Sequence, residues 1–285
     1  GTHVAGIAAG YGVTPGRATY TGPWDDAATQ RDWLIAPGAA PRATLYALKI
    51  FGRTGESELL APAVEWAVDP NGDGDFSDHL DIITLSLGEP FGRADSPEAV
   101  ACDMAARAGV VVVASAGNSG DSYFATAAPG SAARALSVAA TADDDPEQAL
   151  VADRLASFSA RGPSGGPERV WLKPDVCAPG RRINSASAHA ADPSRLASLS
   201  SGTSMAAPHA AGLMALLRQQ RPDWPVTQLK ALVMNTAAGG LVSGPEDNLV
   251  AQSPGRTGAG RIDAARAATT RAIAYDTGAP ERVSI

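Results

Sequence analysis

The chain has 285 residues, of which 45% are hydrophobic and 19% are charged, and this is enough apolar content to bury a substantial core. The formal net charge of −7 excludes the basic footprint that nucleic-acid binding requires. The longest apolar runs, 110–116 and 210–217, are far shorter than the roughly 20 residues of a membrane-spanning helix, so no span is expected.

Strands and helices alternate in the first half of the chain. Four apolar runs predict strands that are covered on both faces, because such strands carry apolar residues at consecutive positions. Helical periodicity predicts crossover helices between the runs. Together they indicate a three-layer α/β fold, with a mainly parallel central sheet flanked by helices. The predicted strands are 43–51, 81–88, 109–116 and 136–140, and the predicted helices are 56–68 and 97–108.

The second half predicts a central buried helix over residues 202–220. This segment is almost entirely small and apolar until Arg218, which is typical of a helix buried on every side. Two prolines end it, and a second helix is predicted over 226–236. Past Gly240 the chain is rich in glycine, proline, serine and asparagine, which is typical of loops, and it ends in a short amphipathic segment, 262–273, and a polar tail.

The strongest motif is SSGTSMAAPH at residues 200–209, where the central helix begins. A serine at a helix N-terminus lies beside unpaired N–H groups that favour negative charge. On Ser204 alone, a plain N-capping serine is the alternative. Pro208 is expected to lie close enough to the helix start that its missing N–H costs little. An α/β-hydrolase motif G-x-S-x-G is excluded because Ala206 replaces its last glycine.

The whole string resembles the nucleophile motif of the subtilisin-like serine peptidases. This resemblance implies that Ser204 is the nucleophile and that the helix beginning there is buried within the three-layer fold. It implies a serine endopeptidase that hydrolyses peptide bonds through an acyl-enzyme.

Residues 110–120 combine a four-valine strand with the turn sequence ASAGNSG. An amide side chain at the exit of a strand can donate a hydrogen bond to a developing oxyanion. A turn asparagine beside glycines is the alternative. The stretch is similar to the oxyanion block of the same family, which implies that Asn118 is the oxyanion donor.

The run DIITLSLG at residues 81–88 resembles the strand that lines the family's substrate groove, although an ordinary core strand would read the same way. An extended polypeptide substrate can pair with its exposed edge. The opposite wall carries only small uncharged residues, so we expect an apolar preference at the residue before the cut. The substrate-binding candidates are Ser86, Leu87, Gly88, Ala114, Ser115, Ala116 and Gly117.

Oxygen-bearing side chains alternate along DPNGDGDFSD at residues 69–78, with glycines at the bends. Such a loop can converge on Ca²⁺. Leu80 stands where an EF-hand has its bidentate acid, so a solvated acidic turn is the alternative. The calcium candidates are Asp69, Asn71, Asp73, Asp75 and Asp78.

Three further features are interpreted as structural. The strings FSARGP at residues 158–163 and LKPDVCAPG at 172–180 are familiar in secreted bacterial members of the family. Asp175 is expected to accept hydrogen bonds rather than to take part in catalysis. Cys102 and Cys177 lie in apolar contexts, which favours buried free thiols over a disulfide.

The chain departs from the family at the general base. The family's catalytic histidine opens the string HGTHVAG, whereas this chain begins at the glycine, so His3 matches the second, structural histidine. The base is expected one residue before Gly1, and the aspartate further upstream, on a strand of the central sheet. His209 follows Ser204 by five positions, about 140° around the helix, and cannot reach the hydroxyl. His79 and His189 have no pattern that positions them.

We therefore expect a secreted, extracellular endopeptidase, with a peptidase domain over residues 1–270 and an extension beginning at 271–285. A short acidic segment, 142–152, stands where some relatives insert a protease-associated domain. Residues 1–285 alone are expected to be inactive. A non-catalytic peptide-binding pseudoprotease and a purely structural or regulatory domain are the alternatives.

Overall fold

The computed structural model describes residues 1–52, 55, 57–142, 153–165, 170–188, 192, 195–244 and 248–277. Most of the acidic segment, 143–152, lies outside the described residues, as do His189 and residues 278–285. Among the helices that are described, none is both long and apolar enough to cross a membrane.

A four-stranded parallel sheet forms the centre, in the order β1-β2-β3-β6. Every residue of β2 and β3 is buried, which confirms the prediction that these apolar runs are covered on both faces. The strands are β1 (Ile82–Leu85), β2 (Val111–Ser115), β3 (Leu136–Thr141) and β6 (Val176–Pro179).

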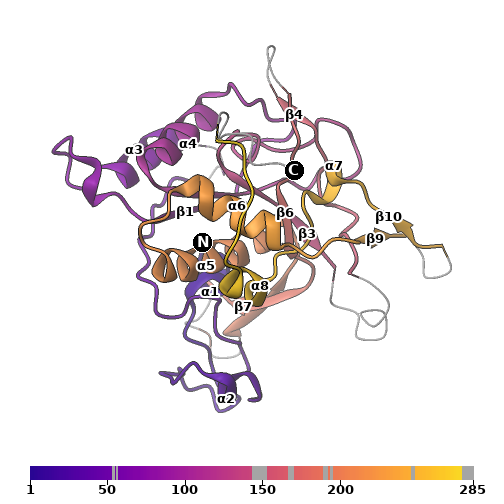
Figure 1. Cartoon of the computed structure of the whole chain (residues 1–285). Coiled ribbons are helices and arrows are strands. Elements are labelled where there is room, and N and C mark those ends of the chain that lie inside the picture. The colour runs from indigo at the N-terminus through magenta and orange to yellow at the C-terminus, as the bar shows by residue number, and fades with distance from the viewer. Residues whose placement is uncertain are drawn as a thin grey trace.

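Helices cover the sheet in two layers, as the sequence predicted. On one face α4 (Pro97–Ala108) packs on β2 and against α3 (Leu60–Val68). On the other, α5 (Thr203–Gln220) crosses all four strands beside α1 (Thr2–Ala9). Figure 1 shows α5 near the middle of the molecule and the α3–α4 pair to one side. The helices α6 (Val226–Thr236) and α8 (Ala264–Thr269) complete the core.

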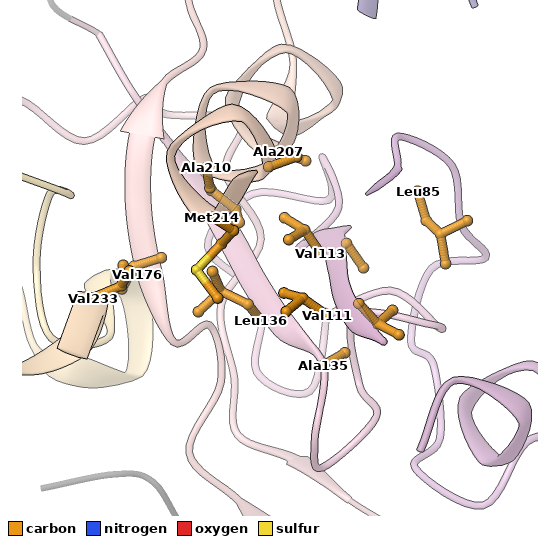
Figure 2. Close-up of a cluster of buried hydrophobic side chains, with 14 of the residues drawn as sticks. Leu85, Val111, Val113, Ala135, Leu136, Val176, Ala207, Ala210, Met214 and Val233 are labelled. Carbon is orange, nitrogen blue, oxygen red and sulfur yellow. The ribbon is translucent and has the colours of Figure 1, made fainter. Parts of the chain in front are cut away.

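Small residues let α5 lie close to its neighbours. In Figure 2, Ala210 and Met214 of α5 point towards Leu136 of β3 in the buried cluster. At Gly212 a Cβ atom would come within 2.9 Å of the backbone oxygen of Ala8, so only glycine fits where α5 meets α1. The close packing fixes the axis of the helix that begins beside Ser204.

The remaining elements are short. The antiparallel pair β7 (Ile183–Ala186) and β8 (Ala197–Ser200) leads directly into α5. The others are α2 (Asp26–Thr29), η1 (Phe76–Asp78), β4 (Ser164–Gly165), β5 (Val170–Trp171), β9 (Val242–Ser243), β10 (Val250–Ala251) and α7 (Pro254–Thr257).

The predicted strand over residues 43–51 is wrong for the described structure. A strand needs a neighbouring strand to bond its N–H and C=O groups, and the described sheet ends at β1, which pairs with β2 alone. Several apolar side chains of the run are consequently exposed, including Leu45 at 53% and Tyr46 at 60%. The run has the apolar pattern of a strand, but no described strand pairs with it.

Candidate functional site

Ser204 is the second residue of α5, and two residues, Ser201 and Gly202, separate this helix from β8. The N-cap is Gly202, with a φ of 154° that side-chain-bearing residues rarely adopt, and no side chain of its own caps the helix. The plain N-capping interpretation of Ser204 is therefore wrong. Its Oγ donates instead to the backbone oxygen of Ser86, at 3.2 Å.

Asn118 lies at the start of α5, although it follows β2 in the chain. Its Oδ1 accepts hydrogen bonds from the backbone N–H of Thr203, at 2.9 Å, and from the Thr203 hydroxyl, at 3.0 Å. The Thr203 Oγ1 in turn accepts from the N–H of Gly117, at 3.1 Å. Because Oδ1 is occupied in this way, the orientation of the amide is fixed. A Cβ atom on Gly202 would lie 3.4 Å from the Asn118 Nδ2 and 3.7 Å from its Oδ1, so the amide group lies against Gly202.

Thr203 is thus a site residue that sequence reasoning missed. It stands inside the nucleophile motif, but nothing in the string indicates that its hydroxyl links Asn118 to Gly117. That link depends on β2 and α5 meeting in space.

Pro208 lies inside α5 rather than at its start, which corrects the expectation for this residue. A proline has no N–H, so the carbonyl oxygen four residues earlier, that of Ser204, has no helical donor. The Ser86 hydroxyl donates to that oxygen at 2.7 Å. Two hydrogen bonds in opposite directions therefore join Ser86 to Ser204.

The groove candidates fall into two groups. Ser86, Leu87 and Gly88 continue from β1, and Gly88 is exposed. On the opposite side, Ala114, Ser115 and Ala116 are buried, and only Gly117 is partly exposed. The two stretches are joined where the Ser115 hydroxyl donates to the Leu87 oxygen, at 3.3 Å.

Ala127 closes the space between the two stretches and was also missed. A Cβ atom on Gly88 would lie 3.1 Å from the Ala127 Cβ, and one on Gly117 would lie 3.0 Å from it. The next residue, Ala128, exchanges two backbone hydrogen bonds of 3.0 Å with Glu89. Small residues therefore pack together where the two stretches meet Ala127.

The described histidines all bond to backbone oxygens instead of Ser204. His3 Nε2 lies 3.1 Å from the oxygen of Ile183 and 3.0 Å from that of Ser198, so it ties α1 to the β7–β8 pair. His79 Nδ1 contacts its neighbour Leu80. His209 Nδ1 contacts Met205, and burial lowers the pKa of this imidazole.

The acidic loop folds as a run of turns in which side chains accept from the loop's own backbone. The Asp69 carboxylate accepts from three N–H groups, at 2.8, 3.1 and 2.9 Å. Asn71, Asp73 and Asp75 each accept from the N–H two residues on. Within the described parts of the chain, no group of three acidic, histidine or cysteine side chains is placed to hold a metal ion.

Asp175 is buried and accepts a 2.7 Å hydrogen bond from the N–H of Ser137, which confirms its structural role. Its carboxylate also pairs with the buried ammonium groups of Lys173, at 2.7 Å, and Lys230, at 3.0 Å. Both cysteines are free and buried, as expected. Burial raises the pKa of the Cys102 thiol to about 12, so this thiol is not reactive.

The sequence matches the family described as Peptidase S8, subtilase family, over residues 1–261. The chain belongs to the subtilase family. It is 35% identical over 251 residues to the serine protease AprX of Bacillus subtilis (strain 168), which covers 82% of this chain and 52% of that protein. It is 37% identical over 202 residues to subtilisin BL of Lederbergia lenta, which covers 70% of this chain and 62% of that protein.

Solved structures support the fold assignment. Sphericase superposes with a TM-score of 0.64 at 26% identity, covering 92% of this chain and 76% of that one. A protease from Pseudoalteromonas arctica PAMC 21717 gives a TM-score of 0.65 at 24% identity, over 93% and 69% of the two chains. This subtilase chain spans about half the length of AprX, 52%, and 62% of subtilisin BL.

Proposed function

We propose that the full-length protein is a serine endopeptidase in which Ser204 is the nucleophile and Asn118 an oxyanion donor. The observation that carries the proposal is that Asn118 is hydrogen-bonded to Thr203, the residue directly before Ser204, at the start of α5. Residues from two distant segments meet there, beside N–H groups of a helix N-terminus that favour negative charge.

In the proposed reaction, Ser204 Oγ attacks the carbonyl carbon of the scissile peptide bond while a general base takes the hydroxyl proton. The carbonyl oxygen becomes an oxyanion, which accepts hydrogen bonds from Asn118 Nδ2 and from the backbone N–H of Ser204 in the first turn of α5. The intermediate then expels the amine, which receives the proton, and leaves an acyl-enzyme. Water then attacks the carbonyl carbon of that ester while the base takes a proton from the water. The bond to Ser204 Oγ breaks, the base returns the proton to this oxygen, and the carboxylic acid product leaves.

The proposed substrate is an extended polypeptide that pairs with the edge at residues 86–88. Main-chain pairing of this kind supplies affinity for any sequence. We propose that the side chain before the cut packs against the two stretches at Gly88 and Gly117, and that apolar side chains are preferred because these stretches are small and uncharged.

The general base is proposed to come from outside residues 1–285, as the family resemblance implies. None of the described histidines bonds to Ser204, whose hydroxyl donates to Ser86. We further propose an extracellular location, a peptidase domain over residues 1–270, and a structural Ca²⁺ at the 69–78 loop. Supporting the last, a carboxylate offers about four acceptor positions, so Asp73 and Asp75 keep free ones beside their turn hydrogen bonds.

Hydrolysis of a denatured protein by the full-length enzyme tests the proposal, with products mapped by mass spectrometry. We expect internal cleavage that Ser204→Ala abolishes. Asn118→Ala should lower kcat by about 10²- to 10³-fold with little change in KM, because the donor acts in the transition state. Peptide binding without any Ser204-dependent cleavage would instead indicate a pseudoprotease.

A further inference from the structure

The chain that follows Asn118 is held by the FSARGP segment, residues 158–163, for which the proposed function gives no role. Three backbone hydrogen bonds join the two. The N–H of Ala160 donates to the oxygen of Gly117, at 3.0 Å, and that of Gly120 donates to Phe158, at 2.9 Å. Further along, the N–H of Ala125 donates to the oxygen of Arg161, at 3.0 Å. The segment therefore borders the whole loop from Gly117 to Ala125.

The Arg161 side chain contacts the middle of the same loop in two ways. Its Nη1 donates to the Asp121 Oδ1 at 2.7 Å, and its guanidinium carbon lies 3.9 Å from the centre of the Tyr123 ring. The side chain is only 17% exposed, and its Nε is buried with no hydrogen-bond partner among the described residues. Burying an incompletely bonded guanidinium costs free energy.

A second guanidinium reinforces the arrangement. Arg256 of α7 lies 3.7 Å from the same Asp121 oxygen, and its side chain is 9% exposed. The exposed carboxylate of Asp121, which belongs to the loop, thus lies close to two largely buried guanidinium groups, those of Arg161 and Arg256, which lie outside the loop. An isolated surface ion pair contributes little to stability, so global stability alone is a weak explanation for this cluster.

We propose that Arg161 is a positioning residue for Asn118. This inference rests on the proposed function, because it takes Asn118 as the oxyanion donor. Arg161 holds Asp121 and Tyr123, and thereby the loop that begins at Asn118, so that the amide keeps its place against Thr203. The role requires arginine: the planar guanidinium bonds Asp121 through its edge and lies over Tyr123 through its face, whereas a lysine ammonium is a point charge.

The first experiment measures kcat and KM of the full-length enzyme and its Arg161→Met and Arg161→Lys variants. A misplacement of about 1 Å in a catalytic group can cost about 10²-fold. We expect kcat to fall about 10- to 100-fold for Arg161→Met and less for Arg161→Lys, with KM changed less than about threefold. Arg93→Met is the matched control, because Arg93 also pairs with an aspartate, Asp95, but on the exposed side of another loop.

The decisive comparison repeats Arg161→Met in the Asn118→Ala background. If Arg161 acts through Asn118, its substitution should cost less than about twofold there, because the donor is already absent. An equal loss in both backgrounds would overturn the proposal. Should Arg161→Met fail to fold, Tyr123→Leu and Asp121→Asn replace it, and unchanged kcat in both would overturn it equally. If Asn118→Ala itself has no effect, the proposed function fails instead.

Discussion

Hydrogen bonds from neighbouring segments hold the start of α5. Thr203 fixes Asn118, and Ser86 bonds the Ser204 oxygen that Pro208 leaves without a helical donor. The proposed groove and the proposed nucleophile are thereby joined, because the segment that is proposed to bind substrate also supports the helix that carries Ser204.

Removing this support should be measurable. Ser86→Ala leaves the Ser204 oxygen without a donor, which costs about 1–3 kcal/mol when the group is buried. We expect the free energy of unfolding to fall by that amount in chemical denaturation, with kcat lowered as well. Thr21→Ala, at an exposed threonine, is the control. Unchanged stability and kcat in the Ser86 variant would show that water or another group satisfies this oxygen.

At this scale the sequence located Ser204 and Asn118 but not the residues that orient them. Both stand in long strings that resemble family motifs. The roles of Thr203 and Ala127 arise from contacts between distant segments, and a local sequence pattern does not indicate such contacts. The N-cap interpretation of Ser204 failed because the first N–H of α5 donates to Asn118, which lies in the segment after β2.

Among the elements, α6 is tied to the sheet by the buried cluster of Lys173, Asp175 and Lys230. Both ammonium groups also donate to the oxygen of Ala135, at 2.8 and 3.0 Å. Two cations and one carboxylate leave a buried net charge of +1. Burial lowers the pKa of Lys173 to about 8, and Lys230 adds to this while Asp175 opposes it.

The cluster predicts how stability depends on pH. An unfolded lysine ionises near its ordinary pKa of 10.5, so between pH 8 and 10.5 the unfolded state binds the proton that folded Lys173 has released. The free energy of unfolding should therefore gain up to about 3 kcal/mol from Lys173 as pH rises through that window, and lose it as pH falls. Chemical denaturation at pH 7.5 and 10 of the inactive Ser204→Ala protein measures this gain.

Lys173→Met should remove the gain, because the ammonium group that releases the proton is then absent. Lys49→Met, at an exposed lysine, should preserve it. A gain of the same size in the Lys173 variant would assign the pH dependence to other groups.

The 69–78 loop gives a second prediction at the scale of elements. If it binds Ca²⁺, a free ion concentration a hundredfold above Kd adds about 2.7 kcal/mol to stability. The melting temperature of the Ser204→Ala protein should then rise on going from chelator to calcium, and Asp73→Ala should reduce the rise. Equal midpoints in the two conditions would leave the loop as an acidic turn.

Two helices, α4 and α6, were predicted with their observed bounds, because residues next to each helix mark where it begins or ends. Ser96 caps the N–H of Ala99 and Gly109 ends the same helix with a φ of 113°, while Pro225 precedes the second. The 43–51 strand failed because pairing is not a local property. The buried lysines were also unpredictable, since lysine is ordinarily exposed and only tertiary contact pairs them with Asp175.

At the scale of the whole molecule, residues 1–285 are predicted to supply the nucleophile and the oxyanion donors, whereas the general base is predicted to lie outside them. Purified residues 1–285, if they fold, should hydrolyse peptides far more slowly than the full-length enzyme. Oxyanion donors and binding alone retain about 10³- to 10⁴-fold over water when triad members are removed. Kinetics of the two proteins side by side check this. Ser204-dependent turnover by residues 1–285 within about tenfold of full length would require a base inside this chain.

The central claim is that Ser204 is an activated nucleophile in the full-length protein. A fluorophosphonate, which reacts covalently with activated serines, tests it most directly when the labelled protein is digested and its peptides are mapped. We predict a single adduct on the peptide that contains Ser204, blocked by prior incubation with a polypeptide substrate and absent from Ser204→Ala. Folded full-length protein that remains unlabelled at Ser204, or that cleaves polypeptides equally well as Ser204→Ala, would contradict the account.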